Sequence, residues 1–413
     1  MHTIGFFDDS AGPGGTTQYL VELLTALNRE QFRPIVFSPR PAPWHAAMVA
    51  LEAEVITGPR LQVEPRSAPV STATLLPTRS GPRPTVGIVR RTRRALAWRL
   101  GLQRDLNTLE ALFRRKPVDL LHSNNTGEEP APIAARRAGI PRILGTLHVD
   151  PDFDLRQSRR HIRLTRACFA ALDRAIAISE NTASAWRAHL DLGPEDQPPF
   201  TVIPNGINLA RLERRHGRAE AIARLGLPAD VRIIGSVGRL DYEKGYADLI
   251  EAMPAILRAV PNAVVLHAGA GPLAASLATE CQRLDITDHV RWLGFRQDVR
   301  DLLEAADLYV QPSWREAQGL AVLEAGAMGV PVIATQVGGM VESLANGDAG
   351  TIIPPMNPPA LADAVIGVLL DPAPALAKAA VLQTRIQTHY TDQLMVTETM
   401  NLYQKLLHTE PRR

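Results

Sequence analysis

The most restrictive feature of this sequence is an alternation of short apolar runs with longer periodic stretches, in two successive series. Apolar runs of four to eight residues between turn residues are typical of buried strands, and the periodic stretches are typical of helices. The alternation predicts parallel sheets with helices on both faces. The runs are TIGFF (3–7), FRPIVFSP (32–39), EVITG (54–58), VDLLHSNN (118–125), RILGTLH (142–148) and RAIAISE (174–180), then VRIIGSVG (231–238), NAVVLHAG (262–269), VRWLGF (290–295), DLYVQPS (307–313), PVIATQ (331–336) and AGTIIP (349–354).

A stretch rich in Pro and acids, DLGPEDQPPF (191–200), separates the two series. At about 150 residues per domain, a chain of this length holds two or three domains. We therefore expect an α/β protein with two tandem doubly wound, Rossmann-like domains that face each other across a ligand-binding cleft. The expected parts are a first domain at 1–198 with an irregular basic insertion at 59–104, a second domain at 199–385, and a C-terminal helix at 386–413 that packs back on the first domain.

Charge is balanced overall, with a formal net charge of +2, so it indicates no nucleic-acid partner. It is uneven locally, because residues 65–104 contain nine Arg and no Asp or Glu. The basic segments 79–104 and 156–166 are candidates for contact with an anionic membrane surface. A solvated helix face is the alternative for both segments.

Several absences narrow the cellular location that we expect. No apolar run approaches the ~18 residues of a membrane span. The first residues lack the basic region of a signal peptide. Two distant cysteines, Cys168 and Cys281, indicate neither a disulfide framework nor a zinc site. We expect a cytoplasmic protein that could contact the inner face of the membrane.

Two loops after predicted strands suit a phosphorylated ligand. In DDSAGPGGTTQYLVELL (8–24), Gly15 precedes a helix, where backbone N–H groups can approach a phosphate or a sugar. A tight turn without a ligand is the alternative there. In SVGRLDYEKGYADLIEAM (236–253), Arg239 and Lys244 offer a planar fork and a point charge to a diphosphate. The alternative is that Lys244 pairs with a neighbour, Asp241 or Glu243.

A third segment, EAQGLAVLEAGAMGVPVIA (316–334), holds two carboxylates among small and apolar residues. Eight helical residues would place Glu316 and Glu324 about 80° apart, so one shared helix face does not explain them. A loop carboxylate and a helix carboxylate that converge on one ligand explain the pattern better. The backbone N–H groups of Gly319 and Leu320, at the expected helix start, suit phosphate oxygens.

Together these segments resemble the retaining glycosyltransferases of family 4, which have the GT-B fold. The family pattern PS-x-x-EGFGL…EAMA-x-G-x-PVV, with its Glu-x7-Glu spacing, is similar to PSWREAQGLAVLEAGAMGVPVIA (312–334), which GG (338–339) and Glu342 follow. The family's GRL…KG and IPNG elements resemble GRLDYEKG (238–245) and VIPNGIN (202–208). The matches lie in the family's order over most of the chain.

The resemblance implies a role for each matched residue. Arg239 and Lys244 would hold the donor diphosphate, Glu316 would bind donor-sugar hydroxyls, and Glu324 would bind the ribose hydroxyls. His148, a strand-end histidine, would lie near the reacting face of the sugar. Gly15 would let the backbone approach the phosphate or the acceptor, and Phe295 and Arg296 would meet the base. The N–H groups of Gln318, Gly319 and Leu320 would contact the sugar and the phosphate.

The implied reaction moves a hexose from a UDP- or GDP-sugar to an acceptor hydroxyl with retention of configuration, without a metal ion or another cofactor. Two alternatives stay open: a nucleotide-sugar 2-epimerase of the same fold, against which the Glu-x7-Glu segment argues, and a non-catalytic nucleotide-sugar-binding protein. The chain departs from the family at Ala317-Gln318, where Gly-Phe is usual. This departure adds a side-chain amide near the expected sugar and leaves the donor sugar open. The acceptor is equally open among lipid-linked sugars, glycans and small molecules.

Overall fold

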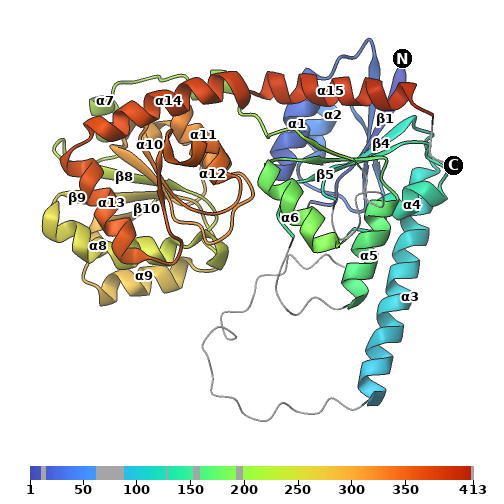
Figure 1. Cartoon of the computed structure of the whole chain (residues 1–413), viewed down its shortest axis with the longest axis horizontal. Helices are drawn as coiled ribbons and strands as arrows, with labels where there is room; N and C mark the ends of the chain where they lie inside the picture. The colour runs from blue at the N-terminus through green and yellow to red at the C-terminus, as the bar shows by residue number, and fades with distance from the viewer. Residues whose placement is uncertain (11–14, 62–87, 127–128, 152–158, 192–198, 411–413) are drawn as a thin grey trace. The chain divides into compact units, whose positions relative to one another are not determined.

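The computed structural model of this chain describes residues 1–10, 15–61, 88–126, 129–151, 159–191 and 199–410 (Figure 1). The chain forms two compact units. Unit 1 comprises Met1–Ala177, Ala183–Ile203 and Val396–Arg413, and unit 2 comprises Ile178–Thr182 and Pro204–Met395. The sequence-based domain limits at 198 and 385 stay predictions beside these units.

Unit 1 is built on a seven-stranded sheet in the order β3-β2-β1-β4-β5-β6-β7, and every neighbouring pair is parallel. The strands are β1 (His2–Phe7), β2 (Phe32–Ser38), β3 (Glu54–Thr57), β4 (Leu120–Ser123), β5 (Ile143–Leu147), β6 (Arg174–Ala177) and β7 (Phe200–Val202). The helices are α1 (Gly15–Ala26), α2 (His45–Ala50), α3 (Ile88–Phe113), α4 (Ala131–Arg137) and α5 (Arg159–Ala170), with most of α6 (Glu180–Leu190) and of α15 (Asp392–His408).

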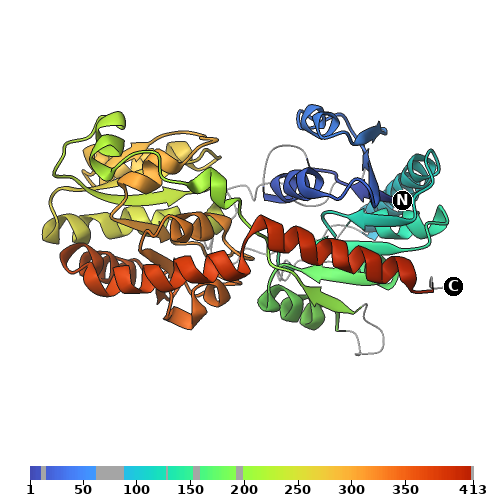
Figure 2. The same cartoon turned by 90° about the horizontal axis from the view of Figure 1, so that it is seen from above.

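Helix α15 packs on unit 1, as Figure 2 shows from above. Tyr403 on this helix is fully buried, and its ring contacts the rings of Phe6 and Phe32. Its hydroxyl lies 2.6 Å from Nδ1 of His122, which ends β4 together with Ser123. The helix expected from residue 386 begins at Asp392, because the preceding Thr391 forms a parallel bridge with Ile207 instead of a helical turn.

Unit 2 is built on a six-stranded parallel sheet in the order β10-β9-β8-β11-β12-β13. The strands are β8 (Arg232–Val237), β9 (Ala263–Ala268), β10 (Val290–Trp292), β11 (Leu308–Gln311), β12 (Val332–Thr335) and β13 (Thr351–Ile353). The helices are α7 (Arg218–Arg224), α8 (Tyr246–Ala259), α9 (Ala274–Arg283), α10 (Arg300–Ala305), α11 (Leu320–Ala327), α12 (Met340–Ser343), α13 (Pro358–Leu370) and α14 (Ala373–His389), with 3-10 turns η3 (Leu209–Leu212), η4 (Tyr242–Lys244), η5 (Thr287–His289) and η6 (Ala345–Gly347).

Successive residues of one strand serve different cores, as a parallel sheet covered on both faces requires. Ile233 and Ile234 on β8 are both fully buried but belong to two separate apolar clusters, one on each side of the sheet. Tyr309 and Val310 on β11 divide in the same way. This arrangement confirms the predicted α/β class and places the polar chemistry at the strand ends.

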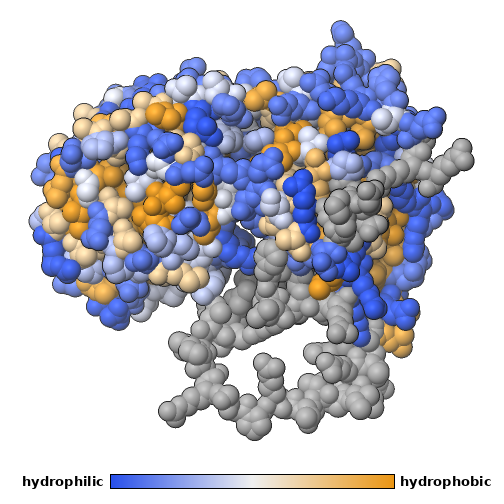
Figure 3. All heavy atoms as spheres, viewed as in Figure 1, coloured by the Kyte–Doolittle hydropathy of each residue, from blue (hydrophilic) through white to orange (hydrophobic). Residues whose placement is uncertain are grey.

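The basic segments lie only partly within the described residues. Residues 79–87 and 156–158 are outside them, whereas α3 and α5 carry the rest of both segments. On the face shown in Figure 3, hydrophilic and hydrophobic residues are interspersed. Among the helices of the described ranges, none by itself has the length and apolarity to cross a membrane; α13 and α14 meet that test only as a pair bent by 97°.

Candidate active site

In unit 2, the loop after β8 and the loop after β11 lie against each other. Gly245 has a φ of +62°, and a Cβ at this position would lie only 2.1 Å from the carbonyl oxygen of Pro312. Glycine is therefore required for both the left-handed turn and the close backbone approach. Next to this contact the Trp314 indole Nε1 donates to Asp248 at 2.6 Å. The two loops together place Lys244 beside the segment that carries Glu316.

Lys244 and Glu316 form an ion pair, with 2.6 Å between Nζ and Oε2. Their side chains are 24% and 15% exposed, so the pair is only partly accessible to water. Glu316 also accepts a hydrogen bond from Ser313 at 3.3 Å, and Ser313 accepts one from Gln311 at 2.9 Å. A chain of buried polar groups thus orients the carboxylate.

The local alternative for Lys244 is wrong. Asp241 pairs with Arg239 at 2.5 Å, and Glu243 pairs with Arg315 at 3.5 Å. Arg239 is 66% exposed, so its guanidinium has room to turn toward a ligand. The structure therefore brings two predicted site residues, Lys244 and Glu316, into direct contact and places a second cation, Arg239, on the same loop as Lys244.

The segment before α11 is held tightly by the next glycine-rich turn. Gly338 has a φ of +53°, and a Cβ there would lie 1.5 Å from the carbonyl oxygen of Glu316. The N–H of Gly339 donates to the carbonyl of Ala317 at 2.8 Å. In the described part of the chain, the backbone N–H groups of Gln318, Gly319 and Leu320 make no hydrogen bond. Free N–H groups at a helix start attract anions.

The Gln318 side chain does not lie open at this site. It is 3% exposed, and both ends of its amide bond to the backbone of Asn205. The expectation that this amide adds a polar group near the sugar is therefore wrong for the side chain, since its hydrogen-bonding capacity is used inside unit 2. Its backbone N–H stays a predicted donor contact.

Three further residues are predicted donor contacts. Glu324 lies half-buried on α11, one turn beyond the free N–H groups. Phe295 is 65% exposed after β10, and Arg296 donates through Nε to the carbonyl of Leu293 at 3.2 Å. Contacts of these residues with a ribose or a base stay predictions.

In unit 1, the predicted residues lie after β1 and β5. Gly15 begins α1 and is exposed. His148 directly follows β5 and is 8% exposed, with Nε2 at 3.3 Å from Oδ1 of Asn124. Burial lowers the pKa of His148 to about 3, partly offset by a hydrogen bond to the Asn124 backbone. The imidazole is therefore neutral at physiological pH and is suited to hydrogen bonding rather than to carrying charge.

Sequence reasoning overlooked a pair of carboxyl groups at the end of β1. Asp8 is fully buried and Asp9 is 9% exposed. Burial, and then the charge of Asp8, raises the pKa of Asp9 to about 6. Asp8 accepts hydrogen bonds from Ser10 at 2.8 Å and from Asn124 at 3.4 Å. Two acids directly after a buried strand were the available signal, because ligands of such sheets bind at that edge.

His122 has a structural position rather than an exposed one. Its two ring nitrogens lie 2.6 Å from the hydroxyls of Tyr403 and Thr146, and burial, then the charge of His148, lowers its pKa to about 3. Because the unfolded chain binds this proton below about pH 6.5 and the folded chain does not, the stability that His122 contributes is present above that pH and is lost as pH falls toward 3.

Between pH 7 and pH 5, we expect wild type to lose about 1–2 kcal/mol more unfolding free energy than the His122→Gln variant loses. The measurement is urea denaturation at both pH values. Asp9 contributes in the opposite direction, since its raised pKa favours the folded state below about pH 6. Because Asp9 is present in both proteins, its contribution cancels in the difference between variant and wild type. Equal pH dependence of variant and wild type would contradict the assignment.

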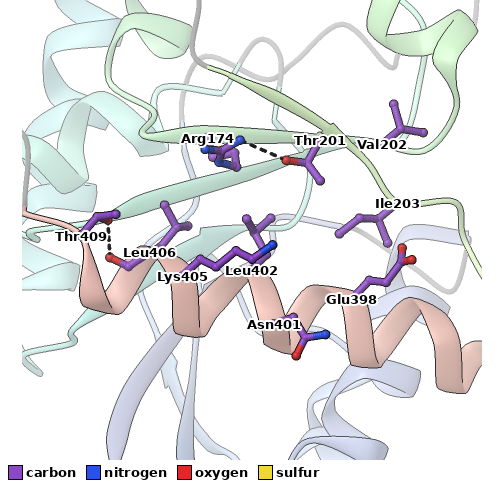
Figure 4. Close-up of a pocket in the computed structure, with 10 residues that line it drawn as sticks. All are labelled: Arg174, Thr201, Val202, Ile203, Glu398, Asn401, Leu402, Lys405, Leu406 and Thr409. Atoms are coloured by element: carbon purple, nitrogen blue, oxygen red, sulfur yellow. Dashed lines mark hydrogen bonds between the residues drawn. The ribbon is translucent and has the colours of Figure 1, made fainter.

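A pocket of about 500 Å³ lies elsewhere on unit 1, between α15, β6 and the edge strand β7 (Figure 4). Its polar lining includes Arg174, Glu398 and Lys405, and Arg174 donates to Thr201 at 3.3 Å. None of the predicted site residues lines it. Among residues 1–10, 15–61, 88–126, 129–151, 159–191 and 199–410, no cluster of three His, Cys, Asp or Glu could hold a metal ion.

Residues 13–211 match the sequence model of Glycosyltransferase Family 4, and residues 217–385 match that of Glycosyl transferases group 1. A 2-deoxystreptamine glucosyltransferase of Streptomyces kanamyceticus is 30% identical over 283 residues, which cover 65% of this chain and 72% of that protein. A glycogen synthase of Mycobacterium tuberculosis (strain CDC 1551 / Oshkosh) is 35% identical over 206 residues, 49% of this chain and 48% of that protein. The chain thus spans about half the length of the first curated relatives that it matches.

Solved structures confirm the predicted GT-B fold. The Anabaena protein Alr3699/HepE in complex with UDP superposes with a TM-score of 0.75 at 20% identity, over 98% of this chain and 100% of that one. WaaG, a glycosyltransferase involved in lipopolysaccharide biosynthesis, superposes with a TM-score of 0.70 at 18% identity, over 97% and 99% of the two chains.

Proposed function

Because this chain belongs to the glycosyltransferases of group 1 and family 4, we propose that it transfers a sugar from a nucleoside-diphosphate sugar to an acceptor hydroxyl. The observation that carries this proposal is the convergence in unit 2 of Lys244, Glu316 and the unbonded N–H groups before α11. A cation, a carboxylate and free N–H groups match a diphosphate joined to a polyhydroxylated ring.

In the proposed reaction, the acceptor oxygen bonds to the anomeric carbon while the bond from that carbon to the diphosphate oxygen breaks. The electron pair stays on the diphosphate, which also takes the acceptor proton. Lys244, Arg239 and the N–H groups of residues 318–320 would stabilise the charge that develops there. The chain's own cations would then supply the positive charge, so the proposal includes no metal ion. Attack on the face that the diphosphate leaves would retain the anomeric configuration.

Each remaining residue has a proposed place in this reaction. Glu316 would bind sugar hydroxyls once Lys244 turns to the diphosphate, and Glu324 would accept from the ribose hydroxyls. Neither carboxylate is proposed as the acid–base pair of a glycosidase, which flanks the scissile bond at about 5 Å. His148 and Gly15 would act from unit 1, beside the sugar and its phosphate.

The donor is proposed to be a UDP- or GDP-hexose, and UDP is the first probe because the Anabaena relative was solved with UDP. The acceptor is proposed to be a glycan, a lipid-linked sugar or a small molecule. A cytoplasmic location, with the basic helices α3 and α5 near an anionic membrane, belongs to the same proposal.

We expect a donor to raise the thermal stability of the protein, since a ligand at 100 times its Kd stabilises the folded state by about 2.7 kcal/mol. The measurement is a thermal-shift screen of UDP- and GDP-sugars, with Lys244→Ala as the control that should lose the shift. Donors that raise the melting temperature are then incubated with the protein, with and without EDTA, and NMR detects transfer, hydrolysis or epimer formation. Accumulation of a 2-epimer would reject sugar transfer, and binding without turnover toward any acceptor would favour a non-catalytic protein.

A further inference from the structure

Gln318 stands at the position of Phe in the family pattern that this segment resembles, and its side chain is buried in unit 2. Its Nε2 donates to the carbonyl of Asn205 at 3.0 Å, and its Oε1 accepts from the N–H of Asn205 at 2.9 Å. The two bonds close a ring, as paired backbone groups do in a sheet. Because Gln318 is 3% exposed, neither bond competes with water, and losing them would leave two buried backbone groups unpaired.

Asn205 is itself fixed in place. A Cβ on the next residue, Gly206, would lie 2.2 Å from the carbonyl oxygen of Thr391, so the two segments are in backbone contact. The N–H of Ile207 donates to the carbonyl of Tyr390 at 2.8 Å. Gln318 therefore attaches its loop to Asn205, in a segment that is itself held against Tyr390 and Thr391.

The same loop is held on its other side by the glycine-rich turn before α12. The carbonyl of Ala317 accepts from Gly339, and the carbonyl of Glu316 lies where any side chain at position 338 would clash. The residue between these anchors and α11 is Gly319, at a φ of +82°. A left-handed glycine is the most adaptable link of such a loop, so the unbonded N–H groups of residues 318–320 keep a fixed direction only while both anchors hold.

We propose that Gln318 is a positioning residue, whose side chain clamps the loop before α11 so that these N–H groups are preorganised for the donor diphosphate. The choice of a nucleoside diphosphate as the ligand rests on the proposed function. The clamp itself rests only on contacts within unit 2. Preorganised donors need no rearrangement when charge arrives, which is why their displacement by a fraction of an ångström weakens binding. The side chain itself makes no contact with the sugar.

The test compares Gln318→Leu and Gln318→Glu with wild type. Gln383→Leu is the matched control, because Gln383 donates to the carbonyl of Ala327 at the opposite end of the same helix. Calorimetry with UDP and GDP gives affinity, and competition by a set of UDP-sugars gives their ranking. Hydrogen exchange reports on peptides 203–207 and 316–323, the second of which contains the N–H groups of Val322 and Leu323 that donate to the carbonyl of Gly319. Peptide 263–268, from β9, reports whether unit 2 is folded.

For Gln318→Leu we expect nucleotide binding to weaken about tenfold, with the UDP-sugar ranking unchanged and faster exchange in both reporting peptides. At pH 8, Gln318→Glu should weaken nucleotide binding as much as Gln318→Leu does. At pH 5.5 its affinity should come closer to that of wild type at the same pH, because a protonated carboxyl can both donate and accept as the amide does. Gln383→Leu should leave affinity and the two peptides unchanged.

Two results would overturn the proposal. A changed sugar ranking at unaltered UDP affinity would make Gln318 a direct sugar contact. Unchanged exchange in peptides 203–207 and 316–323 would show that no clamp exists. If wild type binds neither UDP nor GDP, the proposed function is contradicted, but the clamp is not tested by that result. Exchange in the two peptides then still decides whether the clamp holds the loop.

Discussion

Replacing Lys244 with Ala is expected to slow sugar transfer by about 10²–10³-fold. The reason is that removing one preorganised group from the developing negative charge costs roughly 2.7–4 kcal/mol of transition-state stabilisation. The substitution also leaves Glu316, at 15% exposure, without its cation. The measurement is initial-rate kinetics with the donor found in the thermal-shift screen. Lys378→Ala serves as the control and should keep wild-type rates, because Lys378 is on α14 and donates to the carbonyl of Gly350 at 3.5 Å.

The partner variant Glu316→Ala should lose transfer to a similar extent, because the sugar hydroxyls lose their acceptor. Since the two side chains are bonded in the free protein, their effects should be strongly non-additive in the double variant. Retention of full activity by both single variants with the true substrates would show that the site lies elsewhere. Additive losses would show that the ion pair does not organise the site.

The largest effect on stability is expected at Tyr403, whose ring is fully buried against β1, β2 and β4. Tyr403→Ala should cost about 3–5 kcal/mol of unfolding free energy, as other buried aromatic truncations do. Tyr403→Phe keeps the ring and removes only the partner of His122, so about 1–3 kcal/mol is expected. The measurement is urea denaturation, with hydrogen exchange to localise the opening to unit 1.

The exposed Asn401, on the same helix, is the matched site: Asn401→Ala should change the stability by less than about 0.5 kcal/mol. If Tyr403→Ala left the strands of unit 1 as protected as in wild type, α15 would not be part of that unit's core.

The strands and the order of the motifs could be predicted from the sequence, because continuous apolar runs report burial on both faces directly. Side-chain partners could not, because they depend on contacts distant in the chain. Lys244 had acidic neighbours at positions 241 and 243, yet it pairs with a residue 72 positions away. That choice follows from the backbone contact between Gly245 and Pro312, which no local pattern encodes.

Gln318 illustrates the same limit at the candidate site. A polar residue in a small, apolar loop is typical of a ligand contact, so the sequence indicated an outward role. Its actual partner, Asn205, lies 113 residues earlier. Because a buried amide is stable wherever both of its ends are bonded, only the three-dimensional neighbourhood decides between a ligand and a clamp.

The parallel bridge between Ile207 and Thr391 makes unit 2 a modular segment for protein engineering. The long segment of this unit runs from Pro204 to Met395, and the short segment Ile178–Thr182 completes it. Near the two ends of the long segment, Ile207 exchanges backbone hydrogen bonds with Tyr390 and Asp392. Two breakpoints, at 203/204 and 395/396, would therefore exchange the long segment of unit 2 between relatives as a single cassette, while Ile178–Thr182 stays with the recipient. Chimeras cut there would keep the part of α15 from Val396 onward with the sheet on which it packs.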